Sequence, residues 1–219
     1  MLTDEQQDLI FGSLLGDGNL QTGSDGRTWR YRALHKKKHE PYLFHKYGIL
    51  TSLCASAPAY GEVTDSRTGK VYQRWYFNTL TNPSLNFFAN MFYTYDYREA
   101  VTLGKWVKDV PQKVEKFLTP RALAYFYMDD GALKWLYHTN AMRLCTESFS
   151  LEGVERIQKA LKKLYNVETT LTRKTRSDGS TGYRISIPEK SSATFREVIQ
   201  PYLVDCMKYK VSDGNRGHL

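Results

Sequence analysis

The sequence predicts an α+β fold made of two similar units, each with the element order helix, strand, strand, helix, strand, strand, helix (αββαββα). Residues 10–18 (IFGSLLGDG) and 123–131 (LAYFYMDDG) are both apolar runs that end in Asp-Gly. Each run is followed by the same succession of alternating and amphipathic segments. We therefore expect two units related by a pseudo-twofold axis, at residues 1–105 and 119–219, with a linker at 106–118 and the two apolar helices packed together.

The opening helix of each unit has a defined start and end. Residues 3–6 (TDEQ) form a predicted capping box, in which the Thr and Gln side chains cap each other's backbone N–H groups. The first helix should end at Gly16. In the second unit Thr119 is the expected N-cap, Pro120 fills the first helical position and Gly131 ends the helix.

A pair of strands is predicted after each opening helix. In the first unit a short polar strand and a turn at residues 23–26 precede a strand at 28–34. The alternation of residues in 28–34 predicts a half-buried strand with Arg30 and Arg32 on its open face. The matching strands of the second unit are predicted at residues 133–137 and 142–148.

An amphipathic helix, a hairpin and a closing helix complete each unit. The amphipathic helices are predicted at 39–53 and 150–165, the hairpins at 63–78 and 168–187, and the closing helices near residues 82 and 191. In the second hairpin, a period of two places Tyr183, Ile185 and Ile187 toward a core. Arg184 and Ser186 should then point outward.

Composition favours a nucleic-acid partner. The 219 residues include 31 Lys and Arg against 23 Asp and Glu, a net charge of +8, and 41% are hydrophobic, which is enough for a packed core. The three dispersed cysteines predict neither a disulfide framework nor a zinc site, and they favour a reducing, intracellular setting. No apolar run approaches the roughly 20 residues of a membrane span, and the N-terminus lacks signal-peptide features.

The predicted strands and turns carry many basic side chains. A two-stranded ribbon fits the DNA major groove, where Arg and Lys read guanine. A solvated sheet face is the alternative interpretation, and Lys36, Lys37 and Lys38 suit phosphate contacts better than base reading. The candidate DNA-binding residues are Arg30, Arg32, Lys36, Lys37, Lys38, Arg67, Lys70, Arg74, Lys134, Arg143, Arg173, Lys174, Arg176 and Arg184.

The carboxylates that end the two apolar runs indicate a cation site. Asp17 and Asp130 lie at the negative ends of their helix dipoles, where electrostatics favours cations over anions. A bound cation therefore explains these residues better than folding does. Two copies in one chain predict that both acidic ends meet at one metal-dependent site.

The paired motifs, the duplicated unit and the basic ribbons together resemble the LAGLIDADG homing endonucleases of the single-chain, two-motif type. Residues 118–131 are similar to the corresponding segment of the monomeric enzymes encoded in mitochondrial rRNA introns. The resemblance covers nearly the whole chain. It implies that each unit has an antiparallel, saddle-shaped DNA-binding sheet, and that the units join at the two packed motif helices.

The resemblance also implies residue roles. Asp17 and Asp130 would bind metal and act in catalysis, with Lys108 and Lys210 near the scissile phosphates. The metal site would further include Gly16 and Asp129, the latter as a supporting acid or only a capping residue. Polar residues that organise water in relatives map near His35 and Cys145.

The glycines of the first motif should make room for the larger second motif. Gly12 and Gly16, four residues apart, allow two helices to approach closely. The second motif has Tyr125 at its usually small third position and Asp129 at its seventh. The packing of the two helices is therefore expected to be asymmetric.

The function implied is Mg²⁺-dependent double-strand cleavage of a long asymmetric DNA target by a monomer. Two or three divalent ions are expected, with Mn²⁺ able to substitute and Ca²⁺ able to bind without cleavage. The alternatives are an intron maturase that binds host intron RNA and a DNA-binding regulator without nuclease activity, although both acids and both lysines are present. The spacing of His35, His39 and His45 matches no zinc ligand set. An intron-encoded protein would act in a mitochondrion or chloroplast, and otherwise in a prokaryotic cytoplasm.

Overall fold

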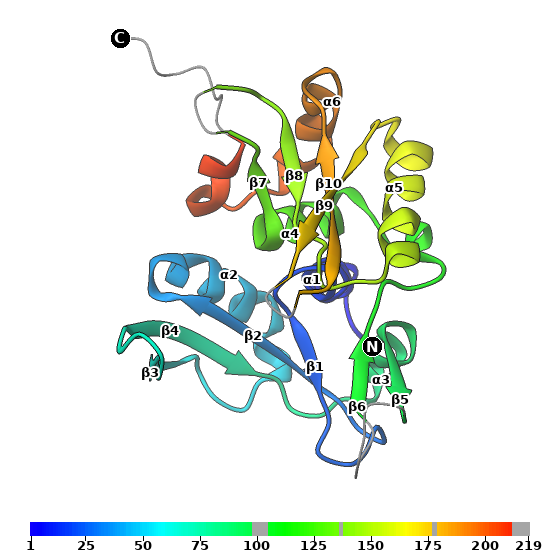
Figure 1. Cartoon of the computed structure of the whole chain (residues 1–219). Coiled ribbons are helices and arrows are strands. Elements are labelled where there is room, and N and C mark those ends of the chain that lie inside the picture. Colours follow the sequence, from blue (N-terminus) through cyan, green and yellow to red (C-terminus); the bar gives the residue numbers. More distant parts are fainter. Residues whose placement is uncertain (98–104, 136–137, 177–178, 212–219) are drawn as a thin grey trace.

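The fold consists of two αββαββα units, as the sequence predicts. The computed structural model describes residues 1–97, 105–135, 138–176 and 179–211. The first unit contains α1 (Asp4–Leu15), β1 (Asn19–Gln21), β2 (Arg30–Lys36), α2 (Glu40–Leu50), β3 (Ala59–Thr64), β4 (Val71–Asn78) and α3 (Pro83–Phe92). The second contains α4 (Pro120–Asp130), β7 (Gly131–Leu133), β8 (Met142–Leu144), α5 (Leu151–Tyr165), β9 (Thr170–Thr175), β10 (Thr181–Ile187) and α6 (Glu189–Ile199). Figure 1 shows the two units above and below the central pair α1 and α4.

The two units have the same sheet topology. Their four-stranded antiparallel sheets run in the orders β1-β2-β4-β3 and β7-β8-β10-β9. One face of each sheet packs against helices of its own unit and supplies core residues, such as Tyr31 and Phe77 in the first sheet and Ile185 and Ile187 in the second. The other face of each sheet carries the more exposed side chains, such as Arg30 and Lys36 in the first sheet.

The predicted helix caps are present. The Thr3 hydroxyl accepts from the backbone N–H of Gln6 at 3.2 Å, and the Gln6 side chain accepts from the backbone N–H of Thr3 at 3.1 Å. Thr119 caps α4 by accepting from the backbone N–H of Ala122 at 3.1 Å, ahead of Pro120 at the first helical position. These local interactions fix where both motif helices begin.

The α1–α4 contact confirms the asymmetry predicted from the motifs. A Cβ added to Gly12 would lie 2.1 Å from the Ala122 carbonyl oxygen and 2.8 Å from the Tyr125 Cβ. A Cβ on Gly16 would lie 2.4 Å from the Asp129 Cβ. The two glycines of the first motif therefore accept the two larger residues of the second.

An additional two-stranded sheet was not predicted. β5 (Tyr93–Asp96) pairs with β6 (Lys105–Lys108), and Trp106 of β6 packs edge-on against Trp29 at a centroid distance of 5.1 Å. The segment assigned to the linker therefore begins with a strand that packs on the first unit. This strand carries Lys108.

The structure corrects both strands predicted after α4. The strand predicted at 133–137 lies earlier, at Gly131–Leu133, and residues 136 and 137 lie outside the described residues. The strand predicted at 142–148 is shorter, because the chain leaves the sheet after Leu144. Thr146 turns inward instead and donates to the Tyr183 carbonyl at 2.6 Å. Ser186 lies on the open face as predicted, since it pairs with Arg143, but it is only 8% exposed and its hydroxyl lies 3.0 Å from that of Thr172 on the neighbouring strand. In the described part of the chain, no helix has the length and apolar character needed to cross a membrane.

Candidate functional site

The C-terminal ends of α1 and α4 bring Asp17 and Asp130 into one acidic site. Burial raises the pKa of Asp17 to about 6, with Asp129 adding to the effect. Burial likewise raises the pKa of Asp130 to about 7, with Asp17 as the next cause. Each carboxylate therefore resists ionisation until a cation balances its charge.

Two lysines hold the ends of the motif helices. Lys108 Nζ donates to the carbonyl oxygens of Gly16 at 3.3 Å and Gly18 at 3.0 Å. Lys210, in the 3-10 segment Asp205–Lys210, donates to those of Met128 at 2.6 Å and Asp129 at 3.0 Å. The last carbonyls of a helix lack intrahelical donors, and the helix dipole favours cations there.

Each of the two lysines predicted to be catalytic therefore lies at the end of one motif helix, Lys108 at that of α1 and Lys210 at that of α4, close to the predicted acids. The two positions are equivalent in the two units. Burial lowers the pKa of Lys108 and of Lys210, whereas the neighbouring aspartates act in the opposite direction. Their ammonium groups are held in place by main-chain oxygens, with no carboxylate as a direct hydrogen-bond partner among the described residues. They are therefore positioned to act on a bound anion.

Asp129 is paired with a lysine inside the protein, whereas Asp130 is not, among the residues that the structure describes. Its Oδ1 and Oδ2 accept from Lys46 Nζ at 2.7 and 3.0 Å, and Oδ1 also accepts from the Tyr42 hydroxyl at 2.9 Å. Both charged side chains of this pair are fully buried. Burial acts to raise the pKa of Asp129, but Lys46 and His35 together bring it below its usual value. The Asp129 oxygens are therefore already satisfied by protein donors.

Sequence reasoning missed Lys46, although a signal was present. Tyr42, Leu43 and Leu50 form the buried stripe of α2, and Lys46 lies on that stripe at helical spacing. A lysine on a buried face requires a partner. Here the partner is supplied by the other unit, 83 residues away in the sequence.

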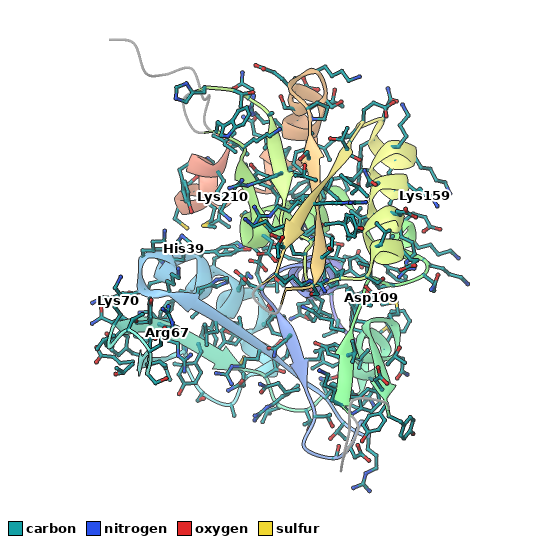
Figure 2. The ribbon with its side chains drawn as sticks, in the orientation of Figure 1. His39, Arg67, Lys70, Asp109, Lys159 and Lys210 are labelled. Carbon is teal, nitrogen blue, oxygen red and sulfur yellow. The ribbon has the colours of Figure 1, made fainter. Side chains whose placement is uncertain are left out.

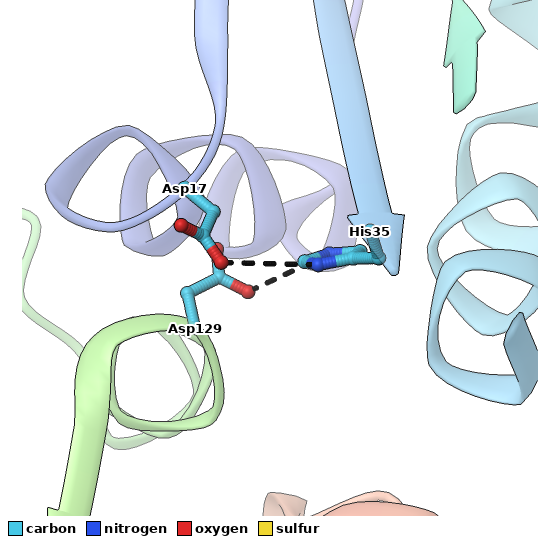
Figure 3. A group of neighbouring side chains, drawn as sticks. All are labelled: Asp17, His35 and Asp129. Atoms are coloured by element: carbon cyan, nitrogen blue, oxygen red, sulfur yellow. Dashed lines mark ion pairs between the residues drawn. The ribbon is translucent and has the colours of Figure 1, made fainter. Parts of the chain in front are cut away.

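His35, at the end of β2, lies between the two acids of different motifs (Figure 3). Its Nδ1 is 3.8 Å from Asp17 Oδ2, and its Nε2 is 3.9 Å from Asp129 Oδ1. Burial, then the charge of Lys46, lowers its pKa to about 3, so the ring is neutral at physiological pH. Its Nε2 is buried without a hydrogen-bond partner in the described structure. A neutral imidazole beside carboxylates suits a metal ion or a metal-bound water.

His39 and His45 do not join this cluster. His39 Nε2 lies 3.1 Å from the Tyr209 hydroxyl, and His45 Nε2 lies 2.9 Å from the Tyr125 hydroxyl. Within the described ranges, oxygen and nitrogen donors of a candidate metal site converge at Asp17, His35 and Asp129, all within 4.8 Å of one another. In this set Asp17 and His35 are the donors available to a divalent ion, because both oxygens of Asp129 already accept from Lys46.

The second unit has a different residue beside its acid. The backbone N–H of Cys145 donates to the Asp130 carbonyl at 2.9 Å, and burial raises the pKa of the half-buried thiol. Cys145 follows β8 much as His35 ends β2. The two acidic helix ends therefore have chemically different neighbours.

The open face of the first sheet carries basic and amide side chains. Arg30 pairs in register with Gln21, and Arg32 pairs with Asn19 and Asn78, while Lys36 pairs with Arg74. Paired residues share a face, and the intervening Tyr31, Ala33 and His35 are buried on the other. Lys37 and Lys38 lie in the 3-10 segment Lys37–His39, and Figure 2 shows Arg67 and Lys70 at the β3–β4 end of the sheet.

The predicted DNA-binding residues of the second sheet do not all lie on its open face. Arg143, Lys174 and Arg184 share the open face by register, and Lys134 follows β7 with its ammonium 4.9 Å from the Trp135 ring centroid. Arg173 pairs with Tyr183 and so lies on the opposite face.

Two arginines of this sheet contact the segment after β8. Arg176 Nε donates to the Glu147 carbonyl at 2.6 Å, and a terminal nitrogen of Arg176 donates to the Phe149 carbonyl at 3.3 Å. Arg184 forms an ion pair with the Glu147 carboxylate. Glu147 was not among the predicted site residues, because the sequence placed it in a continuing strand.

Comparisons with known proteins agree with this geometry. The chain matches the model of the LAGLIDADG DNA endonuclease family over residues 7–195. It is 70% identical to the DNA endonuclease I-ChuI of Chlamydomonas applanata, over 100% of this chain and 99% of that protein. The fold is similar to that of the homing endonuclease I-WcaI bound to its DNA recognition sequence, with a TM-score of 0.78 and 22% identity over 96% of this chain and 87% of that chain. The cytochrome b mRNA maturase bI2 of Saccharomyces cerevisiae is 27% identical over 94% of this chain and 47% of that protein.

Proposed function

The chain belongs to the LAGLIDADG DNA endonuclease family, and we propose that it makes a double-strand break in one long, asymmetric DNA target by metal-dependent phosphodiester hydrolysis. The observation that carries the proposal is the meeting of Asp17 and Asp130 at the ends of α1 and α4, with a lysine held at each end. Because both motifs are in one chain, a monomer supplies a centre for each DNA strand.

Asp17 and Asp130 are the residues proposed to hold the divalent ions. Carboxylate oxygens are preferred ligands of Mg²⁺, and burial together with neighbouring carboxylates raises the pKa of both groups, an effect that a bound cation would oppose. A bound divalent ion would stabilise charge on the phosphate and lower the pKa of the attacking water. Because Lys46 already neutralises Asp129, and Lys108 occupies the Gly16 carbonyl, we propose two ions rather than three.

Solved proteins of similar fold support the choice of ion. I-DmoI was solved in complex with DNA and Mn, with a TM-score of 0.52, and a variant of I-DmoI was solved with its target DNA in the presence of Mg. I-SmaMI was solved with an uncleaved DNA target in the presence of calcium ions. We propose the same pattern here, with Mg²⁺ or Mn²⁺ supporting cleavage and Ca²⁺ supporting binding alone.

The chain's own residues have separate tasks in the reaction. Lys108 and Lys210 would stabilise the negative charge that develops on the phosphate, since each ammonium is already fixed by main-chain oxygens and needs little reorganisation. His35, with a neutral ring whose Nδ1 lies 3.8 Å from Asp17 Oδ2, would hold a water molecule beside Asp17. The open sheet faces would contact the duplex, mainly through phosphates, which predicts strong salt dependence.

The test is cleavage of a randomised duplex library with Mg²⁺ by the full chain and by Asp17→Asn and Asp130→Asn. Both variants should lose double-strand cleavage while still binding duplex. Glu197→Gln, which alters an exposed carboxylate on α6, is the matched control and should cut normally. Double-strand cleavage that survives both aspartate changes would refute the assignment.

An intron maturase is the second candidate, supported by similarity to bI2 over 94% of this chain. A maturase would promote splicing of its host intron RNA without requiring Asp17 or Asp130. Splicing assays with the two Asp→Asn variants distinguish the two functions. Either activity places the protein where its intron is expressed, and the similarity to an algal enzyme favours an organelle.

A further inference from the structure

A carboxylate, that of Glu147, lies among the basic residues on the open face of the second sheet. Glu147 lies over β10, where a Cβ on Gly182 would lie 2.8 Å from both the Glu147 Cβ and its carbonyl oxygen. Gly182 pairs with Lys174 on the open face of this sheet. A negative charge here repels a polyanion such as DNA. Its presence therefore requires an interaction with DNA that compensates for this repulsion.

We infer that Glu147 and Arg184 together read a single G·C base pair in the major groove. This inference rests on the proposed DNA-binding function. Arg184 uses its Nε for the Glu147 carboxylate, and within the described residues its two terminal nitrogens make no other hydrogen bond. The Glu147 carboxylate thus fixes the direction of the guanidinium fork.

The chemical pattern of this pair matches one base pair. Guanine presents two acceptors, N7 and O6, which an arginine fork binds, and the paired cytosine presents an N4 amino donor, which a glutamate accepts. An A·T pair presents the acceptors N7 and O4 on either side of the adenine N6 amino group, followed by the thymine methyl group, so it offers no two adjacent acceptors for an arginine fork. Arg184 and Glu147 therefore form a donor fork beside an acceptor, in the order that a G·C edge requires.

Hydrogen bonds to main-chain carbonyl oxygens hold Arg184 and Glu147 in position before DNA binds. Arg176 donates to the carbonyl oxygens of Glu147 and Phe149, and the Thr146 hydroxyl donates to the Tyr183 carbonyl. The side chains of Arg184 and Glu147 are 25% and 19% exposed, so little ordering remains to be done on binding. Such preorganisation increases discrimination without adding contacts.

The position of Glu147 places the base pair near one cleavage centre. Cys145, two residues earlier, donates its backbone N–H to the Asp130 carbonyl at 2.9 Å. The G·C pair is therefore expected in the half-site cut by the Asp130 centre, close to the scissile phosphate and not at the distal end of the target.

The experiment is selection of bound duplexes from a randomised library in Ca²⁺, with cleavage in Mg²⁺ measured in parallel. The variants are Glu147→Gln, which keeps the shape and removes the charge, and Arg184→Lys, which keeps the charge and removes the fork. The control is Glu168→Gln, which alters a carboxylate paired with Lys162 on the solvent-exposed side. Thermal melting confirms that each protein is folded, and either variant alone suffices for the test.

The wild type should prefer G·C at one position by about 10-fold or more. Glu147→Gln and Arg184→Lys should both reduce the G·C preference at that same position to roughly twofold and leave the preferences at other positions unchanged. Glu168→Gln should match the wild type. An unchanged base preference in Glu147→Gln, or relaxation at different positions in the two variants, would overturn the inference while leaving the proposed function intact. A wild type that enriches no sequence would overturn both.

Discussion

The substitution Gly12→Ala tests the central contact between the units. A methyl group at this position would lie 2.1 Å from the Ala122 carbonyl oxygen, whereas an ordinary contact is about 3.5 Å. The carbonyl is a main-chain atom of α4 and cannot rotate away, so the two helices must separate by roughly 1 Å. Overpacking of this kind typically costs about 1–3 kcal/mol.

A second glycine provides a control with the opposite expected sign. Gly48 is an exposed residue of α2, and a Cβ there would meet nothing within 4 Å. Gly48→Ala should therefore add about 0.5–1 kcal/mol of stability through helix propensity. The same propensity gain offsets part of the cost at Gly12, which leaves a net loss of about 1 kcal/mol.

Thermal unfolding followed by circular dichroism measures the difference. For a chain of this size, about 1 kcal/mol lowers Tm by roughly 2–4 °C, and the Gly48→Ala gain raises it by roughly 1–4 °C. The roughly 1 Å separation should also reduce cleavage by up to about 100-fold, because it displaces Asp17 relative to Asp130. If Gly12→Ala were as stable and active as Gly48→Ala, the close α1–α4 packing would be wrong.

Three further predictions concern charge. Lys46→Met leaves the buried Asp129 without its cation and should lower the free energy of unfolding by about 3–5 kcal/mol in urea titrations, with partial recovery on adding Asp129→Asn; full stability in the single variant would contradict a buried pair. Because the folded-state pKa values of Asp17 and Asp130 lie at about 6 and about 7, above the ordinary 3.8, the metal-free protein should lose stability as pH rises from about 4 to about 7. The rise in Tm on adding Mg²⁺ should accordingly be larger above this window than below it, and scanning calorimetry that found no such pH dependence would refute the acidic site. Lys36→Ala should weaken binding of all duplexes alike and reduce the slope of log Kd against log salt by about one in fluorescence anisotropy, whereas a changed base preference would make Lys36 a base reader.

The sequence was sufficient for the element order and for the paired motifs. Capping at Thr3 and Thr119 depends on residues within one helical turn, so local chemistry decides it. The asymmetric packing of the motif helices could also be inferred, since Gly12 is small where Tyr125 is large. These features depend on residue size and short-range spacing, both of which are visible in one sequence.

The missed residues depend on contacts between distant segments. Lys46 is interpretable only once its partner in the other unit is known, 83 residues away. Glu147 was assigned to a strand because its neighbours alternate in character, but the inward turn of Thr146 toward the Tyr183 carbonyl ends that strand early. Strand β6 is short and polar at both ends, so its pairing with β5 had no periodic signal.

The seventh position of each motif explains why the two units cannot be equal. Gly16 has no side chain there, and this allows the Asp129 carboxylate to reach across the interface to Lys46 and Tyr42 of the first unit. An aspartate at both seventh positions would place two buried carboxylates against each other with only one lysine to balance them, and a glycine at both would leave Lys46 buried without a partner. The ion pair is therefore compatible with one arrangement of the two units. Since burial, and then the charge of Lys46, lowers the pKa of the neighbouring His35 and keeps its ring neutral, the Asp17 centre acquires an imidazole environment that the Asp130 centre, next to Cys145, does not share.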